Sequence, residues 1–298
     1  MIKNDSAFKA FCGAAAIIVL LLAFAPLITV PAYTTYASIG QEINIESTVV
    51  SNPSEPAVSI IGEEPVFGSN PLYDKYTISE RKSLNLPLAL PESNSYYGEK
   101  TVYLTFDDGP DPENTLAILR ILKENNIKAT FFVVGTQVEK YPQALKNVFD
   151  AGHAIGNHSY NHVYRDLYKS PAAYIAQLSQ TDEKIKSILG VRPRISRAPG
   201  GSAGSFTKFY WEELKVNGYT EVGWNISSGD ASSAKAPQII NNIARQLENK
   251  FLWSHAIVLM HDGRGHSETV AALPVIIKLF KDRGFEFRVI NLETPPAW

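Results

Sequence analysis

The stretch Thr105-Phe106-Asp107-Asp108-Gly109-Pro110 guides the interpretation of the whole chain. It continues an alternating apolar run of the kind that forms a β-strand, and its Gly-Pro pair ends that strand abruptly. Two adjacent carboxylates are therefore expected at the C-terminal end of a strand. A single Asp before Gly is common in turns. Asp107 and Asp108 in tandem suggest one carboxylate for a metal ion and one that can move a proton.

The composition narrows the class of protein. The chain has 298 residues, enough for one large domain or two small ones, and its 45% hydrophobic content is ordinary for a globular core. With 28 basic and 30 acidic residues the net charge is −2, which argues against a nucleic-acid partner. Cys12 is the single cysteine, so residues 13–298 contain no disulfide and no thiolate zinc site. A metal ion there must be held by His, Asp or Glu.

Residues 1–37 have the features of a signal peptide or an N-terminal membrane anchor. Lys3 and Lys9 provide a basic start, and no charged residue occurs from Ala10 to Gln41. A signal peptide needs ~7–15 apolar residues and a small-residue cleavage site, whereas an anchor needs ~20 apolar residues. We favour an uncleaved anchor that contacts the membrane. In either case we expect the remaining chain to be extracytoplasmic, membrane-anchored or secreted, and associated with the cell wall.

Residues 38–95 are predicted to be an extracytoplasmic lead-in, and 96–298 the catalytic domain. Prolines at 53, 56, 65 and 71 interrupt the lead-in, and no helical periodicity survives there. We interpret it as a spacer between the membrane and the working domain.

From about residue 100 onward, short apolar runs alternate with helix-like segments. The expected strands are 101–106, 129–134, 153–156, 194–197, 219–225, 256–260 and 285–290. The expected helices are 112–125, 137–150, 171–189, 206–217, 236–249 and 267–283. This alternation implies parallel strands joined by right-handed crossovers, and about seven units suggest a closed barrel, although the spacing does not exclude an open sheet. In both architectures the C-terminal ends of the strands form the active face.

Two histidines follow the strand predicted at 153–156. His158 and His162 are four residues apart, so on a helical turn they would share one face and could bind one ion. Together with Asp108 they make a set of two imidazoles and one carboxylate. Such a set is typical of catalytic metal sites, because it leaves positions open for water and substrate.

Two further polar clusters, at residues 197–202 and residues 224–230, fall at predicted strand ends, and the second of them contains Asp230. Arg197 could hold Asp107 by a charge-assisted hydrogen bond. Gly200 and Gly201 let the backbone approach a ligand closely, with an N–H free to bind an oxyanion.

His261 ends the apolar run 257–260 and is predicted to be a proton donor. A nearby carboxylate, either Asp230 or Asp262, would raise its pKa and keep it protonated. His266 is a further candidate for substrate contact, whereas His153 is better explained as a buried core histidine.

These five clusters, in this order, resemble the motifs of the polysaccharide deacetylase family, carbohydrate esterase family 4, and in particular those of bacterial peptidoglycan N-acetylglucosamine deacetylases. The resemblance covers about residues 100–290. It implies an α/β fold, a distorted (β/α)7 barrel of TIM-like deacetylase type. It also implies one divalent metal ion, usually Zn²⁺ with Co²⁺ or Ni²⁺ as alternatives, and the removal of N- or O-acetyl groups from glycans.

The resemblance assigns a role to each matching residue. The implied metal ligands are Asp108, His158 and His162. The implied catalytic residues are the base Asp107, the acid His261, and the residues that orient the base and tune the acid, Arg197 and Asp230. The implied oxyanion site and acetyl pocket contain Gly200, Pro199 and Leu259, and Trp224 is a candidate for sugar contact.

The sequence departs from the family pattern at two positions. An aromatic residue usually follows the proline of the third motif, where this chain has Gly200. Tryptophan usually follows the aspartate of the fourth motif, where this chain has Ala231. Both changes remove an apolar side chain from the wall of the pocket. They therefore affect the expected size and shape of the pocket more than the expected reaction.

The leading hypothesis is a monomeric, metal-dependent deacetylase acting on N-acetyl groups of GlcNAc or MurNAc in cell-wall polysaccharide, with peptidoglycan as the favoured partner. One alternative is a deacetylase of chitooligosaccharide or O-acetylated xylan. Another is a catalytically weak glycan-binding protein on the same fold. A third is a metal hydrolase for a bond such as a phosphoester, which a second metal-binding cluster would favour and for which the sequence offers no second motif.

Overall fold

The computed structural model describes residues 71–297 of the chain. The predicted signal peptide or anchor and residues 38–70 of the predicted lead-in lie outside the described residues. Among residues 71–297, no helix is both long enough and apolar enough to span a bilayer.

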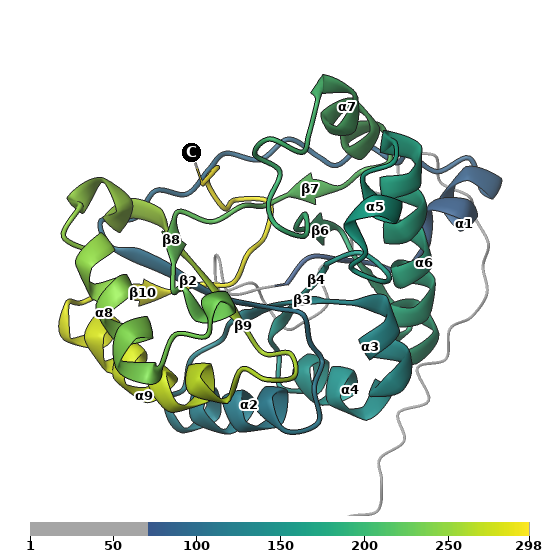
Figure 1. The fold of residues 1–298 in the computed structure, drawn as a ribbon. Coiled ribbons are helices and arrows are strands. Elements are labelled where there is room, and N and C mark those ends of the chain that lie inside the picture. The colour runs from purple at the N-terminus through teal and green to yellow at the C-terminus, as the bar shows by residue number, and fades with distance from the viewer. Residues whose placement is uncertain (1–70, 298) are drawn as a thin grey trace, which may run out of the picture. The chain divides into compact units, whose positions relative to one another are not determined.

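A curled, eight-stranded sheet forms the centre of the part of the chain that the structure describes (Figure 1). Its strands are β2 (Thr101–Asp107), β3 (Thr130–Val133), β4 (Ala154–Asn157), β6 (Ile195–Ser196), β7 (Thr220–Glu221), β8 (Ile226–Ser227), β9 (Ala256–His261) and β10 (Glu286–Phe287). They are hydrogen-bonded in the order β7-β6-β4-β3-β2-β9-β8, and β10 pairs with the start of β2. Every ladder is parallel, so the C-terminal strand ends lie at one end of the sheet.

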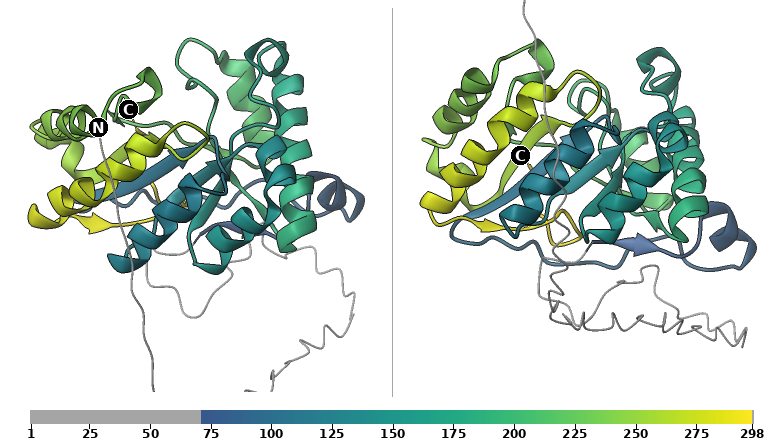
Figure 2. Two further views of the ribbon diagram at one scale, coloured as in Figure 1. Left: turned by 60° about the horizontal axis from the view of Figure 1, so that its bottom comes forward. Right: turned by 90° about the horizontal axis from the view of Figure 1, so that it is seen from below.

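Helices surround the outside of the sheet (Figures 1 and 2). They are α2 (Asn114–Glu124), α3 (Gly135–Lys140), α4 (Pro142–Asp150), α5 (Tyr164–Leu167), α6 (Pro171–Leu189), α7 (Lys208–Val216), α8 (Ala236–Gln246) and α9 (Ser267–Asp282), with the 3₁₀ turns η1 (Asp230–Ser232) and η2 (Lys250–His255). This arrangement is the predicted distorted (β/α)7 barrel. Within residues 71–297 no ladder joins β7 to β8, so the barrel wall is interrupted between them.

Strand β2 is covered on both faces, because Val102, Leu104 and Phe106 are buried on one face and Tyr103 on the other. It lies between β3 and β9, and all seven of its residues are buried. Leu104 and Phe106 belong to the main hydrophobic cluster with residues of the outer helices. Tyr103 points to the other face, where it packs with Phe132 and Ile195 inside the barrel. The strand ends at Asp107, where the sequence becomes polar.

The segment predicted as a helix over 171–189 is present as α6 with those bounds. The hydroxyl of its N-cap, Ser170, accepts a hydrogen bond from the Ala173 N–H at 3.1 Å, and Gly190 ends it with a φ of 77°. The single helix predicted over 137–150 is wrong, because the structure has α3 and α4 instead. Pro142 lacks an N–H and restricts Tyr141, so the helix is interrupted there.

The strand predicted over 219–225 is shorter and is divided from a second strand. Within that range the structure has β7 and a loop over 222–225, and β8, which the sequence did not indicate, begins after it at Ile226. The carbonyl groups of Val222 and Gly223 accept hydrogen bonds from Arg197 at 2.9 Å each. These carbonyls bind a side chain instead of continuing the ladder, which explains the division.

The described part of the predicted lead-in packs on the barrel domain. It contains β1 (Tyr73–Asp74), which pairs antiparallel with β5 (Arg192–Pro193), and the short helix α1 (Ile78–Ser83). Asp74 is fully buried and accepts hydrogen bonds from Arg81 at 2.6 Å, Arg192 at 3.1 Å and Arg194 at 2.5 Å. Removing one partner from such a buried network leaves an uncompensated charge, which costs about 3–5 kcal/mol. The expected spacer therefore gives way, from residue 71 onward, to a structural part of the domain.

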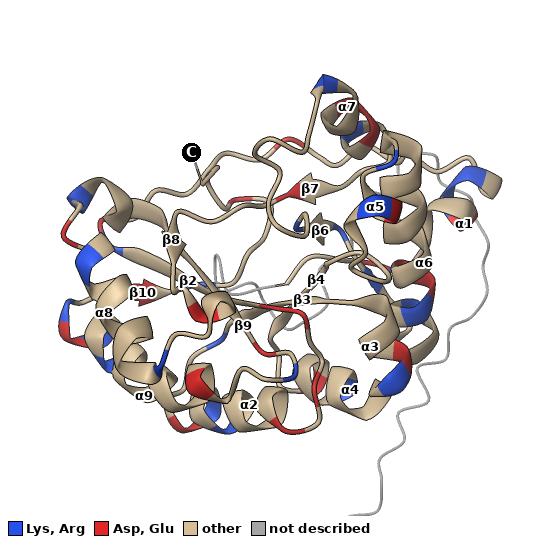
Figure 3. Ribbon diagram, viewed as in Figure 1, with Lys and Arg blue, Asp and Glu red and all other residues tan. Residues whose placement is uncertain are grey.

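Charged residues of both signs are interspersed along the outer helices (Figure 3). Lys146 pairs with Asp150 at 2.9 Å, and Lys278 pairs with Asp282 at 2.7 Å, each across one helical turn. Exposed pairs of this kind contribute about 0.3–0.5 kcal/mol each, so they keep the surface solvated and add little to stability.

Candidate active site

The parallel sheet gathers the predicted residues at one end of the barrel. Asp107 ends β2 and His261 ends β9, and the two are paired across these neighbouring strands. His158 directly follows β4, and Arg197 directly follows β6. The strand register therefore places the predicted base beside the predicted acid.

Asp108, His158 and His162 form a group with the composition of a metal site. The Asp108 Oδ1 atom lies 3.5 Å from His158 Nε2 and 3.2 Å from His162 Nε2. Their candidate ligand atoms all lie within 4.8 Å of one another. Asp108 Oδ1 is buried and has no hydrogen-bond partner, although an unpaired buried carboxylate oxygen is costly. These residues fit a divalent cation, since a cation would satisfy that oxygen together with two imidazole nitrogens.

The backbone around this group corrects one expectation. His158 and His162 do not lie on a helical turn; they occupy a loop between β4 and α5. Ser159 and His162 have φ values of 72° and 57°, and Asp108 has a φ of 76°. Non-glycine residues in this left-handed region cost about 1–3 kcal/mol each and persist where the surroundings impose them. Two of the three candidate ligands are thus held in strained conformations.

Backbone contacts orient His158. Its Nδ1 atom lies 2.8 Å from the carbonyl oxygen of Arg197. Because a carbonyl can only accept, Nδ1 carries the proton and Nε2 presents a lone pair toward Asp108. Burial lowers the pKa of His158 to about 3, so the ring is neutral at physiological pH. A neutral imidazole with a fixed tautomer is the form that binds a metal ion.

Arg197 holds Asp107, as the sequence indicated. Its Nη1 atom donates to Asp107 Oδ1 at 3.0 Å and to Thr105 Oγ1 at 2.6 Å. Both Arg197 and Asp107 are almost completely buried. Burial raises the pKa of Asp107 above its usual value, and the charges of Arg197 and His261 oppose that rise. The carboxylate is therefore fixed in place and more basic than an exposed aspartate.

His261 pairs with Asp230, which resolves the choice between Asp230 and Asp262. The His261 Nδ1 atom lies 2.8 Å from Asp230 Oδ1. Burial opposes the charged form of His261, but the hydrogen bond to Asp230 and the nearby carboxylates raise its pKa to about 9. Asp262 instead accepts a hydrogen bond from Thr115 at 2.5 Å and lies beside Gly109. The geometry thus supports a protonated His261.

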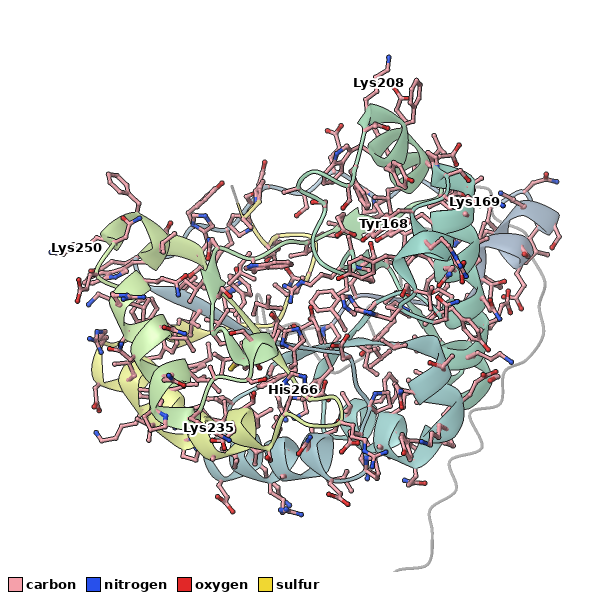
Figure 4. All side chains as sticks on the ribbon, viewed as in Figure 1. Tyr168, Lys169, Lys208, Lys235, Lys250 and His266 are labelled. Carbon is pink, nitrogen blue, oxygen red and sulfur yellow. The ribbon has the colours of Figure 1, made fainter. Side chains whose placement is uncertain are left out.

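A second group of one carboxylate and two histidines consists of Asp230, His261 and His266. The sequence offered no second motif of this kind, because His266 is remote from Asp230 in the chain. Figure 4 shows His266 near the start of α9, and its ring stacks on that of His261 at 5.0 Å. Asp230 Oδ1 accepts from Ser228 and His261, and Oδ2 accepts from the His261 N–H and Thr269. With both oxygens satisfied, this group does not fit a cation as the first group does.

The predicted pocket residues lie around these groups. The Gly201 N–H donates to the Ala198 carbonyl at 2.8 Å, whereas the exposed Gly200 makes no backbone hydrogen bond to the described residues. Leu259 lies two residues before His261 on β9 and is buried. Trp224 lies in the loop after β7, where its ring packs against Gly201. The Pro199 carbonyl accepts a hydrogen bond from Tyr168 at 2.5 Å.

Sequence reasoning missed Glu221 as a positioning residue. Its Oε1 atom accepts from the Ala198 N–H at 2.5 Å, and its Oε2 atom accepts from Ser196 at 2.8 Å. Glu221 therefore ties the loop after Arg197 to the end of β7. Its only sequence signal is a single acid inside an apolar segment.

Comparisons with known proteins agree with this geometry. Residues 94–222 match the family model for polysaccharide deacetylase. A peptidoglycan-N-acetylglucosamine deacetylase of Bacillus cereus is 31% identical over 220 residues, which cover 72% of this chain and 78% of that relative. The peptidoglycan-N-acetylmuramic acid deacetylase PdaA of Bacillus subtilis is 32% identical, with 65% of this chain and 71% of that relative covered. The chain belongs to the polysaccharide deacetylase family.

Solved structures agree as well. A CE4 esterase of Streptococcus mutans has a TM-score of 0.61 at 32% identity, covering 65% of this chain and 87% of that chain. The catalytic domain of a peptidoglycan N-acetylglucosamine deacetylase from Eubacterium rectale has a TM-score of 0.61 at 30% identity, covering 69% of this chain and 96% of that chain. These matches identify the fold as that of the CE4 esterases.

Proposed function

We propose that this protein hydrolyses N-acetyl groups of cell-wall peptidoglycan. The observation that carries the proposal is the unpaired, buried Asp108 oxygen facing two histidines. A buried base, Asp107, lies beside it, and the protonated His261 lies on the next strand. The peptidoglycan deacetylases among its relatives favour this substrate over other glycans.

Asp108, His158 and His162 would hold the metal ion, and Zn²⁺ suits a set of two imidazoles and one carboxylate best. When bound, such an ion lowers the pKa of a water molecule and polarises an acyl carbonyl. The side chains of Asp108 and His162 are 31% and 32% exposed, whereas that of His158 is 3% exposed. Two of the three candidate ligands are thus accessible to substrate, and the third is enclosed by the protein.

The residues of the chain divide the proton transfers between them. Asp107, fixed by Arg197, takes a proton as water attacks the acetyl carbon. The Gly200 N–H donates to the developing oxyanion, a contribution worth about 10²–10³ in rate for one donor. His261 then gives its proton to the departing amine as the carbon–nitrogen bond breaks. The products are acetate and a free amino sugar. Leu259 borders the pocket that receives the acetyl group, and Trp224 contacts the sugar.

The place of action is part of the same proposal. Peptidoglycan lies outside the cytoplasm, and the apolar N-terminal segment with its basic start provides a route of export. We propose that the protein acts at the outer side of the membrane as a monomer, tethered by that segment.

Acetate release by the purified full chain is the decisive measurement. The chain is supplied with Zn²⁺ and offered peptidoglycan, chitooligosaccharide and acetylated xylan, with Asp107→Asn as the matched variant. We expect acetate from peptidoglycan with the parent and about 10²–10⁴-fold less with the variant, because a general base is lost. Equal acetate release by the parent and the variant would show that Asp107 is not the general base. Zn²⁺ binding without acetate from any glycan would favour a binding protein.

A further inference from the structure

A strip of aromatic rings runs outward from the candidate metal site. It consists of Tyr164, Tyr168, Phe206 and Trp211, and we call these four residues the aromatic strip. The Tyr164 ring lies 5.7 Å from that of His162 and 5.8 Å from that of Tyr168. Phe206 follows at 6.3 Å from Tyr168, and Trp211 at 5.3 Å from Phe206. The rings are contiguous although they come from α5, α7 and the loop between β6 and α7.

The middle of the strip is explained by packing. Tyr168 and Phe206 pack against a buried cluster that includes Tyr174 and Tyr210. The Tyr168 hydroxyl also donates to the Pro199 carbonyl. In Figure 4, Tyr168 lies below α7 and Lys208 extends from the tip of that helix. These two rings therefore form a fixed base for the strip.

The two ends of the strip are not explained by packing. Tyr164 is 51% exposed and Trp211 is 45% exposed. Neither belongs to the buried cluster beneath the strip. Tyr164 and Trp211 form one connected aromatic surface with the half-buried rings between them. Exposure of a connected apolar surface to water is unfavourable, and such surfaces usually mark binding sites.

The inner end of the strip occupies the space that residue 200 leaves free. Gly200 has a φ of 72°, and a Cβ atom placed on it would lie 2.5 Å from the Tyr164 hydroxyl oxygen. Tyr164 thus stands where the side chain of a larger residue at 200 would begin. The aromatic side chain that the sequence lacks after Pro199 is supplied by Tyr164 at the start of α5.

We propose that the aromatic strip binds the sugar units next to the one that loses its acetyl group. Aromatic rings combine a large apolar face with a polar tip, which suits the apolar faces and hydroxyl groups of pyranose rings. Tyr164 contacts the sugar at the reacting centre, and Trp211 contacts a unit further along the chain. The proposal rests on the proposed function, and it names a glycan chain of several sugars as the ligand.

The test measures how affinity depends on chain length. Calorimetry on the full Zn²⁺-loaded chain compares N-acetylchitopentaose with N-acetylchitobiose, for the parent, Trp211→Ala, Trp211→Phe and Phe251→Ala. Phe251 is the matched control, because it is an exposed aromatic on η2, outside the strip. We expect Trp211→Ala to weaken pentaose binding about 3- to 10-fold, with a smaller effect on chitobiose. Trp211→Phe should restore most of the affinity, and the control should bind as the parent does.

Kinetics provide the second readout. With pentaose as substrate, Trp211→Ala should raise KM by the same factor and change kcat little, because three other rings of the series of contacts lie between Trp211 and His162. Parent-like pentaose binding by Trp211→Ala, equal losses for both chain lengths, or no preference of the parent for pentaose would each overturn the proposal. If no glycan releases acetate but binding follows the expected pattern, the proposed function is wrong and the proposal that the aromatic strip binds glycan is supported.

Discussion

Two groups of one carboxylate and two histidines lie at the same end of the barrel and differ in one respect. In both groups the candidate ligand atoms lie within 4.8 Å of one another. Asp108 has a buried oxygen without any hydrogen-bond partner, whereas both oxygens of Asp230 are satisfied by donors from the chain. Composition and proximity therefore do not distinguish a metal site from a proton-donating pair, and hydrogen-bond saturation does.

The two carboxylates differ in what each can still bind. The charge of Asp108 remains available for a cation. The charge of Asp230 is committed to His261, and it contributes to the rise of the His261 pKa to about 9. The group around Asp108 can bind a metal ion, whereas the group around Asp230 can donate a proton.

The largest effect is expected when the first group is broken. Asp108→Asn should reduce the bound metal from one ion per chain to none under equilibrium dialysis, because the unpaired anionic oxygen is lost. Activity should fall about 10³-fold or more, since a catalytic ion supplies several kcal/mol of transition-state stabilisation. Chelation of the parent should reproduce the loss, and added Zn²⁺ should restore the parent only. A full metal content in the variant would contradict the assignment.

Breaking the second group should reduce the rate and leave the ion bound. We expect Asp230→Asn to retain one ion per chain and to lose about 10²–10⁴ in kcat/KM. His261 acts in its protonated form, so activity is present below its pKa and is lost as pH rises through about 9 in the parent. Without the Asp230 charge that pKa falls, and the alkaline limb of kcat/KM should move to lower pH. If the alkaline limb of kcat/KM stayed at the same pH in the variant, Asp230 would not be the residue that raises the pKa of His261.

A smaller effect is expected for Arg197→Lys, which lies between the two groups. Lysine keeps the charge but cannot donate at once to Asp107, Thr105 and two carbonyl groups as Arg197 does. We expect about a 10²-fold fall in kcat, because the base is displaced from its productive position. The metal content should be that of the parent, which dialysis checks alongside the kinetics. Loss of the ion would instead mean that the Arg197 side chain also keeps its own backbone carbonyl in position to bind His158.

The smallest effect is expected for His266→Phe. The ring stack on His261 is kept, and only a 3.8 Å approach of His266 Nδ1 to Asp230 is lost, which is too long for a hydrogen bond. Such a contact is worth at most about 1 kcal/mol, so kcat/KM should change by about fivefold at most. Metal stoichiometry serves as the control. A loss of bound metal would make the second group an ion site after all.

Much of the site could be predicted because parallel strands bring their C-terminal ends together. Asp107, Asp108, His158, Arg197 and His261 each follow an apolar run, and the sheet collects them as expected. The contact from Arg197 to Asp107 was anticipated for the same reason. The positions of the strand ends can be predicted from the local hydrophobic pattern, and this prediction does not require the conformation of the loops.

Other features could not be predicted, because they depend on loop conformation and long-range contacts. The helical turn expected for His158 and His162 is a loop, since Ser159 and His162 adopt positive φ values. The lead-in contains Asp74, whose three arginine partners include two that are more than a hundred residues away. No periodic pattern marks such a contact.

The sequence alone determined the family, the alternation of parallel strands with helices and the main reactive side chains, because strand and helix periods and motif order are properties of the chain. The closed barrel was implied by the family resemblance, since the spacing did not exclude an open sheet. Only the tertiary structure decided that Asp230 and not Asp262 pairs with His261, and that Asp108, unlike Asp230, keeps an oxygen without a hydrogen-bond partner. It also decided that Tyr164 fills the space beside Gly200. The physical reason is that hydrogen bonds are made or lost over a few tenths of an ångström. Distances of that size are set by packing between distant segments.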